Sequence, residues 1–252
     1  MHNFIGNSTN KSNNIPVNFK GENKVYEAQK LSQLLNIPVK YTNQTHGTNI
    51  AILTSQDQDL SNIKADAIIT TLPNVAIGVY TADCIPLLIE CKDLIGAVHL
   101  GRKSLVNGLA QKVLKTISTD FGVNLANLKC YIGPSLGFEN HTTWVEEVTN
   151  ISDKYKYNYP KGVHFFNNIV MMSHYLQKHN LTFESVADRS SVKLDAVSYL
   201  CDILTEHGVD PKYIFRDKTD TFINHNFHSY RRDYPYHGLN FSYIFMGEAT
   251  KL

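Results

Sequence analysis

The sequence has few cysteines, no excess charge of either sign and no long hydrophobic run. Four cysteines in 252 residues are too few for a disulfide-stabilised scaffold, and none forms a CxxC pair, so we expect free thiols. Twenty-four Lys and Arg against 23 Asp and Glu leave a net charge of +1. No overall electric field therefore favours nucleic acid or an acidic membrane as a partner.

Membrane and secretion signals are also missing. The longest apolar run, residues 75–91, is interrupted by Asp83 and Glu90, whereas a membrane span needs roughly 18–20 clean apolar residues. The asparagine-rich first residues contain no apolar core of a secretory signal. We therefore expect a cytoplasmic protein without a membrane partner, and the 42% of hydrophobic residues predict a folded chain with a sizeable core.

The order of predicted elements indicates one domain of mixed α and β structure. Residues 1–24 are polar and are predicted to form an N-terminal arm, while no repeat or low-complexity linker divides residues 25–252. Apolar periodicity predicts helices over residues 22–35, 103–118, 167–179 and 193–207. Short apolar runs predict strands over residues 50–53, 67–70, 75–80, 85–91, 94–100, 129–132, 213–215 and 241–245, several of them buried on both faces.

Three residues with metal-ligand side chains stand at the edges of predicted strands. These are His46, Cys84 and His99, separated by 38 and 15 residues. Such separations are too long for a zinc-finger knuckle and fit strands that a sheet brings together. Two imidazoles and one thiolate leave zinc an open fourth position, as in catalytic sites. Spacing alone favours the other interpretation, a buried cysteine with two hydrogen-bonded histidines.

Five short motifs occur in the order typical of one family. The chain resembles the laccase-domain, YfiH-like family, once described as polyphenol oxidases and now as purine nucleoside phosphorylases with adenosine deaminase activity. The resemblance covers residues 40 to 245 approximately. Its motifs are Gln44-Thr45-His46-Gly47, Ala65-Asp66-Ala67 with Thr81-Ala82-Asp83-Cys84-Ile85-Pro86, His99-Leu100-Gly101, Ile132-Gly133-Pro134-Ser135-Leu136-Gly137 and Ser229-Tyr230-Arg231-Arg232-Asp233.

The resemblance implies a fold, a metal and a reaction. His46, Cys84 and His99 match the family's zinc ligands, and the implied fold is a layered α/β/β/α sandwich in a single α+β domain. The implied substrates are adenosine, inosine or guanosine with phosphate, which would give the free base and ribose 1-phosphate, with deamination of adenosine as a second reaction. Multi-copper oxidation is disfavoured, because it needs several histidines in paired clusters and those of this chain are isolated.

Six further residues are candidates for the same site. Asp83 and Gln44 flank the ligands and would orient water or a nucleobase, or else hold the ligands in place. Arg102 and Lys103 begin a predicted helix and are candidates for binding phosphate, with a solvated basic corner as the alternative. Arg231 and Arg232 are read either as part of an anion site or as a structural ion-pair cluster.

Departures from the family pattern leave two other functions open. Arg102 stands where the family has a tryptophan, and the N-terminal segment has no arginine before paired glycines. The family's Tyr-Glu-Val stretch is replaced by residues 138–142, its late Cys-Thr by Arg216-Asp217, and a late arginine by Leu239. The chain could thus be a degenerate member that works by binding. Alternatively, Cys84 and His99 could form a metal-free cysteine hydrolase or deamidase.

Overall fold

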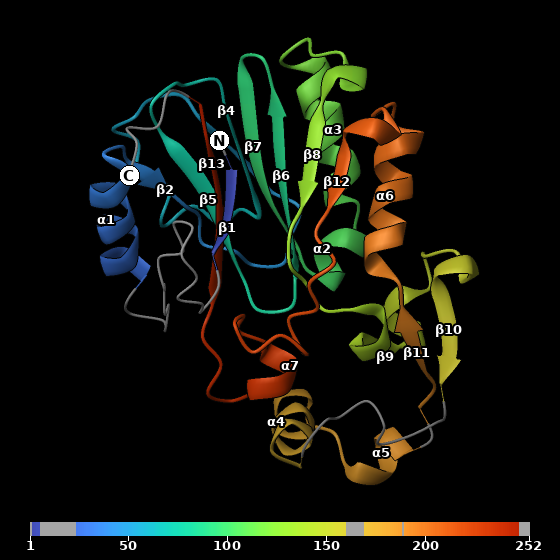
Figure 1. Cartoon of the computed structure of the whole chain (residues 1–252). Coiled ribbons are helices and arrows are strands. Elements are labelled where there is room, and N and C mark those ends of the chain that lie inside the picture. Colours follow the sequence, from blue (N-terminus) through green and yellow to red (C-terminus); the bar gives the residue numbers. More distant parts are fainter. Residues whose placement is uncertain (1, 6–23, 160–168, 188, 247–252) are drawn as a thin grey trace.

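The computed structural model describes residues 2–5, 24–159, 169–187 and 189–246, arranged mainly as two β-sheets packed face to face with helices on the outside (Figure 1). The larger sheet has the strand order β12-β8-β6-β7-β4-β3. Its strands are, in chain order, β3 (Ile50–Leu53), β4 (Ala67–Thr70), β6 (Ile85–Cys91), β7 (Leu94–Leu100), β8 (Lys129–Ile132) and β12 (Ile214–Arg216).

The second sheet has four strands in the order β1-β13-β5-β2. They are β1 (His2–Ile5), β2 (Val39–Lys40), β5 (Ala76–Thr81) and β13 (Asn240–Phe245). Each residue of β4, β5 and β7 is buried, which confirms for these apolar runs the expectation of strands covered on both faces. The expectation is wrong for β3, the edge strand of the larger sheet, where Ile52 is exposed.

Helices cover the outer face of each sheet. Helices α2 (Arg102–Val106), α3 (Leu109–Thr119) and α6 (Ala196–Glu206) lie over the six-stranded sheet, and α1 (Lys24–Leu35) lies over the four-stranded sheet. The α3 residues Leu109, Val113 and Ile117 are buried at four-residue spacing, as one stripe of an amphipathic helix requires. The result is the α/β/β/α sandwich that the resemblance implies.

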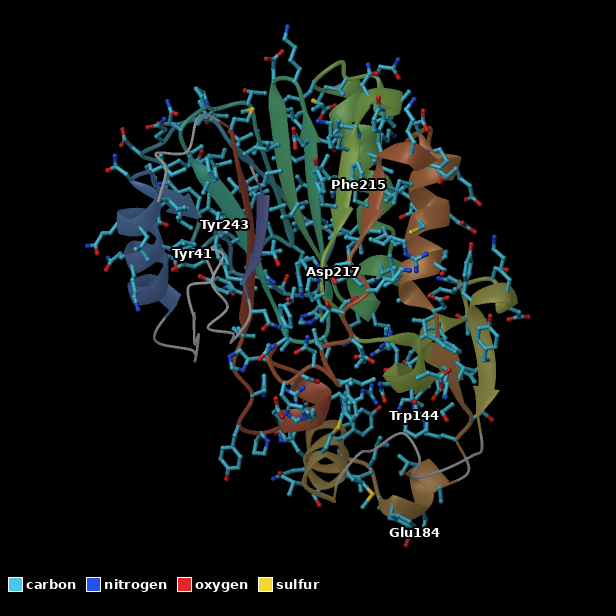
Figure 2. The ribbon with its side chains drawn as sticks, in the orientation of Figure 1. Tyr41, Trp144, Glu184, Phe215, Asp217 and Tyr243 are labelled. Atoms are coloured by element: carbon cyan, nitrogen blue, oxygen red, sulfur yellow. The ribbon has the colours of Figure 1, made fainter. Side chains whose placement is uncertain are left out.

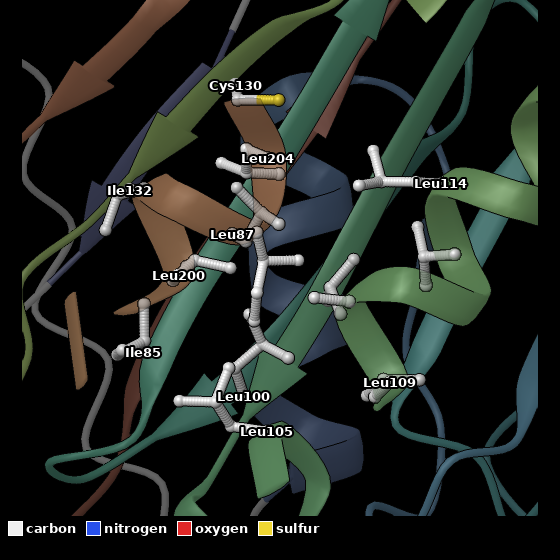
Figure 3. Packing of buried hydrophobic residues seen from close by; sticks show 14 of the residues in the cluster. Ile85, Leu87, Leu100, Leu105, Leu109, Leu114, Cys130, Ile132, Leu200 and Leu204 are labelled. Atoms are coloured by element: carbon white, nitrogen blue, oxygen red, sulfur yellow. The ribbon is translucent and has the colours of Figure 1, made fainter. Parts of the chain in front are cut away.

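Three layers of apolar side chains fill the sandwich. One layer lies between the six-stranded sheet and helices α3 and α6, where Leu87, Leu114, Leu200 and Leu204 interdigitate (Figure 3). A second layer lies between the two sheets, and a third lies between the four-stranded sheet and α1. Figure 2 labels one residue of each sheet: Phe215 on β12 of the six-stranded sheet and Tyr243 on β13 of the four-stranded sheet.

A smaller unit lies at one end of the sandwich. It contains a three-stranded sheet in the order β10-β11-β9, formed by β9 (Thr142–Trp144), β10 (Lys156–Tyr159) and β11 (Ser191–Leu194). Helices α4 (Ile169–His179), α5 (Phe183–Ala187) and α7 (Tyr230–Asp233) lie at the same end (Figure 1). Trp144 is fully buried there, packs with Val186 and donates a hydrogen bond to the Tyr175 hydroxyl (Figure 2).

Two helix predictions are wrong in detail. The single helix predicted over residues 103–118 is two helices, because Gly108 adopts a left-handed φ of 83° between α2 and α3. The helix predicted from residue 193 begins at Ala196, since Ser191–Leu194 pair in a sheet and Asp195 caps the helix by accepting from Ser198 N–H.

The first residues of the chain differ in part from the predicted arm. His2–Ile5 pair with β13 as an antiparallel strand, although the sequence favours an irregular arm over residues 1–24. Residues 6–23 lie outside the described residues, so the boundary between the arm and a domain over residues 25–252 stays a prediction. In the described part of the chain, no helix combines the length and the apolar character needed to cross a bilayer.

Candidate metal centre

One end of the six-stranded sheet collects the three predicted ligands. Strands β3 and β4 run parallel, and β4 and β6 both pair antiparallel with β7. Strands β3, β4 and β6 therefore begin where β7 ends. His46 lies in the turn before β3, Cys84 directly precedes β6, and His99 is the penultimate residue of β7.

The three side chains form a compact group. His46, Cys84 and His99 place one ligand atom each within 4.8 Å of one another. The Nε2 atom of His46 lies 3.7 Å from the Cys84 Sγ, and the two imidazole rings meet edge to face at 4.7 Å between centroids. His46 is exposed, Cys84 is half-buried and His99 is buried, so the group lies at the surface with His99 at its base.

The backbone around the group is shaped for close approach. His46 has a left-handed φ of 57°, and Asp83, next to Cys84, has a φ of 88°. These conformations are costly for residues other than glycine and require support from surrounding contacts. Gly101 packs directly against the group, because a Cβ atom there would lie 2.6 Å from His46 Cδ2 and 3.1 Å from the Cys84 Sγ.

Buried Asp66 fixes the orientation of His99. The His99 Nδ1 donates a hydrogen bond of 2.8 Å to the Asp66 Oδ1. Burial alone would raise the pKa of Asp66, but hydrogen bonds from His99 and from the Gly47 N–H lower it to about 2, so the carboxylate is ionised and accepts. The Nε2 atom of His99 is therefore the one presented to a metal.

Charge coupling activates the thiol. Burial opposes ionisation of Cys84, but the positive charge of His99 and hydrogen bonds from both histidines lower the pKa of the thiol to about 6. Burial likewise opposes protonation of His99, and the Cys84 thiolate and Asp66 raise its pKa to about 9. Without a metal, the pair is thus a thiolate and an imidazolium at neutral pH.

The donor set fits a single zinc ion. Thiolate and imidazole are the ligands that zinc prefers, and three protein ligands leave one position open. A carboxylate behind a metal-ligating histidine is a common support of such sites, and Asp66 supplies one to His99. The residues can therefore hold a metal ion.

Asp83 connects the Cys84 turn to the C-terminal part of the chain. Its carboxylate accepts hydrogen bonds from the Thr221 hydroxyl at 2.7 Å and the Arg231 N–H at 2.6 Å. Burial raises the pKa of Asp83, and these hydrogen bonds offset only part of that effect. These contacts hold the turn before Cys84. Holding a ligand in place is one of the two roles that the sequence leaves open for Asp83; orienting water or a nucleobase is the other.

Gln44 makes a two-point contact with the neighbouring sheet. Its Nε2 donates to the Tyr80 carbonyl and its Oε1 accepts from the Tyr80 N–H, both at 2.7 Å. Both ends of the amide are therefore engaged with β5. This contact anchors the turn that carries His46, and a direct role of Gln44 toward a nucleobase stays a prediction.

The arginines near the site differ in their surroundings. Arg102 is half-buried and forms an ion pair of 2.9 Å with Glu147, whereas Lys103 is exposed. Arg231 donates to the Thr142 carbonyl, 2.8 Å away. Arg232 donates to three backbone carbonyls of residues 221–227 and pairs with Asp233. These contacts are those of a structural ion-pair cluster, one of the two interpretations of this motif.

The sequence did not single out the role of Asp66 or the environment of His141. Asp66 belongs to a recognised motif, and an acidic residue at the start of an apolar strand is a usable signal, because buried carboxylates are rare without partners. His141 is half-buried, and burial followed by the positive charges of Arg231 and Arg102 lowers its pKa to about 3. Nothing in its local sequence indicates that environment, which arises from distant segments.

Comparison with known proteins gives one family and several distant relatives. The family model described as "Multi-copper polyphenol oxidoreductase laccase" matches residues 20–247. A purine nucleoside phosphorylase of Aquifex aeolicus is 44% identical over 64 residues, which are 25% of this chain and 31% of the relative. A purine nucleoside phosphorylase of Clostridium acetobutylicum is 34% identical over 98 residues, or 38% of this chain and 40% of the relative. The alignments thus span less than half of these relatives.

Two solved structures share the fold over most of the chain. The hypothetical protein YfiH of Bacillus licheniformis superimposes with a TM-score of 0.69 at 21% identity, covering 88% of this chain and 80% of that one. YlmD of Geobacillus stearothermophilus gives a TM-score of 0.68 at 20% identity, with coverage of 89% and 80%. At these identities the likeness establishes the architecture.

Proposed function

We propose that this chain, which belongs to the multi-copper polyphenol oxidoreductase laccase family and has distant relatives named purine nucleoside phosphorylase, is a zinc-dependent purine nucleoside phosphorylase that also deaminates adenosine. The observation that carries the proposal is the meeting of His46, Cys84 and His99 within 4.8 Å. One three-ligand group suits a mononuclear site, whereas multi-copper oxidation requires several metal sites.

The three side chains would hold the ion, and the surrounding residues would keep them in place. Zinc would supply a Lewis acid that polarises the substrate or lowers the pKa of water. Asp66 keeps Nδ1 of His99 occupied so that Nε2 faces the ion. Asp83 holds the turn before Cys84, and Gln44 holds the turn that contains His46.

Arg102 is the residue that we assign to phosphate. It directly follows Gly101, which lies against His46 and Cys84, so the backbone of Arg102 lies next to the metal centre. A bound phosphate would replace Glu147 as the partner of Arg102, because guanidinium pairs with phosphate in the same two-point manner as with carboxylate. Lys103 would then add long-range attraction, since its side chain is exposed.

A metal-free cysteine hydrolase is the second candidate function. The observation that favours it is the lowered pKa of Cys84, about 6, which makes the thiolate the main form at neutral pH. A thiolate beside an imidazolium is the reactive form of cysteine in acyl transfer. The same pair is also a metal site in its unloaded form, so activity and metal content must be measured together.

The deciding experiment combines metal content with turnover. The tag-free protein and its Cys84→Ala variant would be assayed for bound metal by mass spectrometry, and for conversion of adenosine and inosine with and without phosphate. We expect near-stoichiometric zinc in the wild type, none in the variant, and ribose 1-phosphate only when phosphate is present. Zinc-free protein that leaves both nucleosides unchanged would contradict the proposal.

The other functions give different results in the same experiment. Rapid alkylation of Cys84 at neutral pH without a chelator, in zinc-free protein, would favour the cysteine hydrolase. Nucleoside binding without turnover would indicate a degenerate member that acts by binding. A protein that contains zinc and releases inosine from adenosine, but forms no ribose 1-phosphate, would restrict the activity to deamination.

A further inference from the structure

Asp66 lies between the two chain segments that carry the histidines of the metal centre. It directly precedes β4 and is fully buried. Its backbone carbonyl accepts a hydrogen bond of 2.7 Å from the His99 N–H, and its own N–H donates to the Asn49 carbonyl at 3.0 Å. The β-ladder therefore fixes the position of this residue relative to both β3 and β7 before its side chain makes any contact.

The carboxylate of Asp66 accepts hydrogen bonds from both histidine segments. Its Oδ1 accepts from the His46 N–H at 2.9 Å and from the His99 Nδ1 at 2.8 Å. Its Oδ2 accepts from the Thr45 N–H at 3.1 Å, the Thr45 hydroxyl at 3.2 Å and the Gly47 N–H at 2.7 Å. One side chain thus connects the turn of residues 45–47 to the imidazole of His99.

These contacts explain how the turn keeps its conformation. His46 adopts a left-handed φ of 57°, which a histidine does not favour by itself. Three consecutive N–H groups, those of Thr45, His46 and Gly47, converge on the carboxylate, so the backbone wraps around a negative charge. A buried carboxylate with this many donors holds its surroundings more strongly than a neutral acceptor would.

We propose that Asp66 is the positioning residue of the metal centre, which aligns two of its three ligands at once. It holds the imidazole of His99 with Nε2 toward the ion, and it holds the turn that directs His46 to the same point. The inference rests on the proposed metal centre and adds a residue whose role is to fix its geometry rather than to bind the ion. Cys84 is placed independently, through the contacts of Asp83.

The chemistry of the donors distinguishes a carboxylate from an amide at this position. Each oxygen of Asp66 faces at least two donors. An asparagine has one oxygen and one NH₂ group, so in either orientation its NH₂ faces N–H donors. The Asp66→Asn variant is nearly isosteric and yet cannot reproduce the arrangement.

The test measures zinc affinity and the His99 proton separately. Wild type, Asp66→Asn and the control Asp59→Asn would be compared by chelator competition for Zn²⁺. Asp59 is an exposed carboxylate between β3 and β4 that accepts a hydrogen bond from the Ser61 N–H. Loss of such a supporting contact typically weakens metal binding by about 10–100-fold. We expect that loss for Asp66→Asn and no change for Asp59→Asn.

Proton NMR of histidine-labelled protein provides the second measurement. In the metal-free wild type, the Nδ1 proton of His99 should give a downfield resonance from its hydrogen bond to the carboxylate, assigned by its loss in His99→Gln. The resonance should disappear in Asp66→Asn and persist in Asp59→Asn. Because the wild-type spectrum decides by itself whether the contact exists, its absence overturns the inference even if Asp66→Asn does not fold.

The outcomes separate this inference from the proposed function. If the wild type binds no zinc but shows the downfield proton, the metal centre fails while the Asp66 to His99 contact stands. If the wild type binds zinc and Asp66→Asn binds it equally well, the positioning role is overturned while the metal centre stands. If zinc binds but nucleosides are not converted, only the proposed reaction fails.

Discussion

Gly101 illustrates how one missing side chain permits the site to form. The backbone at this position passes so close to His46 and Cys84 that a Cβ atom would lie within 2.6 Å and 3.1 Å of their side chains. Its φ of −74° is available to any residue, so the requirement for glycine is one of space and not of backbone conformation. The residue thereby links the end of β7 to the geometry of two ligands.

Replacement of Gly101 by alanine should impair the metal centre more than the fold. The added methyl group must displace the His46 ring or the Cys84 sulfur, and we expect zinc affinity to fall by about tenfold or more, as for other losses of ligand support. Gly96→Ala is the matched control within β7, the strand that Gly101 directly follows, because the nearest contact of the added Cβ would be an ordinary 3.4 Å. Equal zinc affinity of the two variants would contradict the prediction.

His141 should make the protein sensitive to mild acid. Burial and the charges of Arg231 and Arg102 lower its pKa in the folded state to about 3, from 6.5. Below pH 6.5 the unfolded chain binds a proton that the folded protein rejects, so stability falls as the pH decreases toward 3. The expected loss between pH 8 and pH 5 is about 2 kcal/mol.

The measurement is urea unfolding of the wild type and His141→Gln at several pH values. The variant should lose less stability than the wild type over the range from pH 8 to pH 5, by about the same 2 kcal/mol. A change in stability that is equal at every pH would mean that the substitution affects packing alone.

At the scale of elements, five strands have the bounds that their sequences predict, whereas one predicted helix is divided at a single residue, Gly108. Predicted and observed bounds coincide for β3, β4, β6, β7 and β8, because each is a short apolar run bounded by turn residues. The apolar stripe of residues 103–118 predicts one helix, whereas the chain forms α2 and α3 with Gly108 between them. The apolar periodicity continues through the break between α2 and α3, so the periodicity does not reveal the break.

The break between α2 and α3 should be intolerant of a side chain. Alanine at the φ of 83° found at Gly108 is strained, and Gly108→Ala should lower the free energy of unfolding by about 1 kcal/mol. Lys115→Ala, on the exposed face of α3, should change it by less than about 0.5 kcal/mol. Stabilisation by Gly108→Ala in urea unfolding would show that a continuous helix is accessible.

At the scale of the whole molecule, the metal centre joins the two sheets. His46 lies on the connection from β2 to β3, and Cys84 on the connection from β5 to β6. Each of these connections passes from the four-stranded sheet to the six-stranded sheet, which itself carries His99. A bound ion would therefore stabilise the sandwich as a unit, because the unfolded chain does not bring the ligands together.

Zinc should accordingly raise the thermal unfolding midpoint. Free zinc at about 100 times its dissociation constant adds about 2.7 kcal/mol of stability, which corresponds to roughly 5–10 °C for a chain of this size. Calorimetry with zinc and then with a chelator should show this shift in the wild type and no shift in Cys84→Ala. A zinc-dependent shift that persists in Cys84→Ala would place the ion elsewhere.

The sequence alone predicted eight of the strands from their apolar runs. The layered architecture and the ligand set His46, Cys84 and His99 were predicted from the resemblance of the ordered motifs to a known family. Apolar runs, turn residues and ordered motifs are local signals, so His46, Cys84 and His99 could be predicted together although they come from distant segments. The small sheet of β9, β10 and β11 was not predicted, because its strands are short and mostly polar or aromatic.

The groups that surround the ligands come together only in the folded chain. The five hydrogen bonds of the Asp66 carboxylate, the contact of Gly101 with His46 and Cys84, and the low pKa of His141 each depend on residues far apart in the chain. Such contacts depend on strand order and register, which local patterns do not specify. Burial then sets the strength of each charge interaction, since desolvation exists only once the chain is packed.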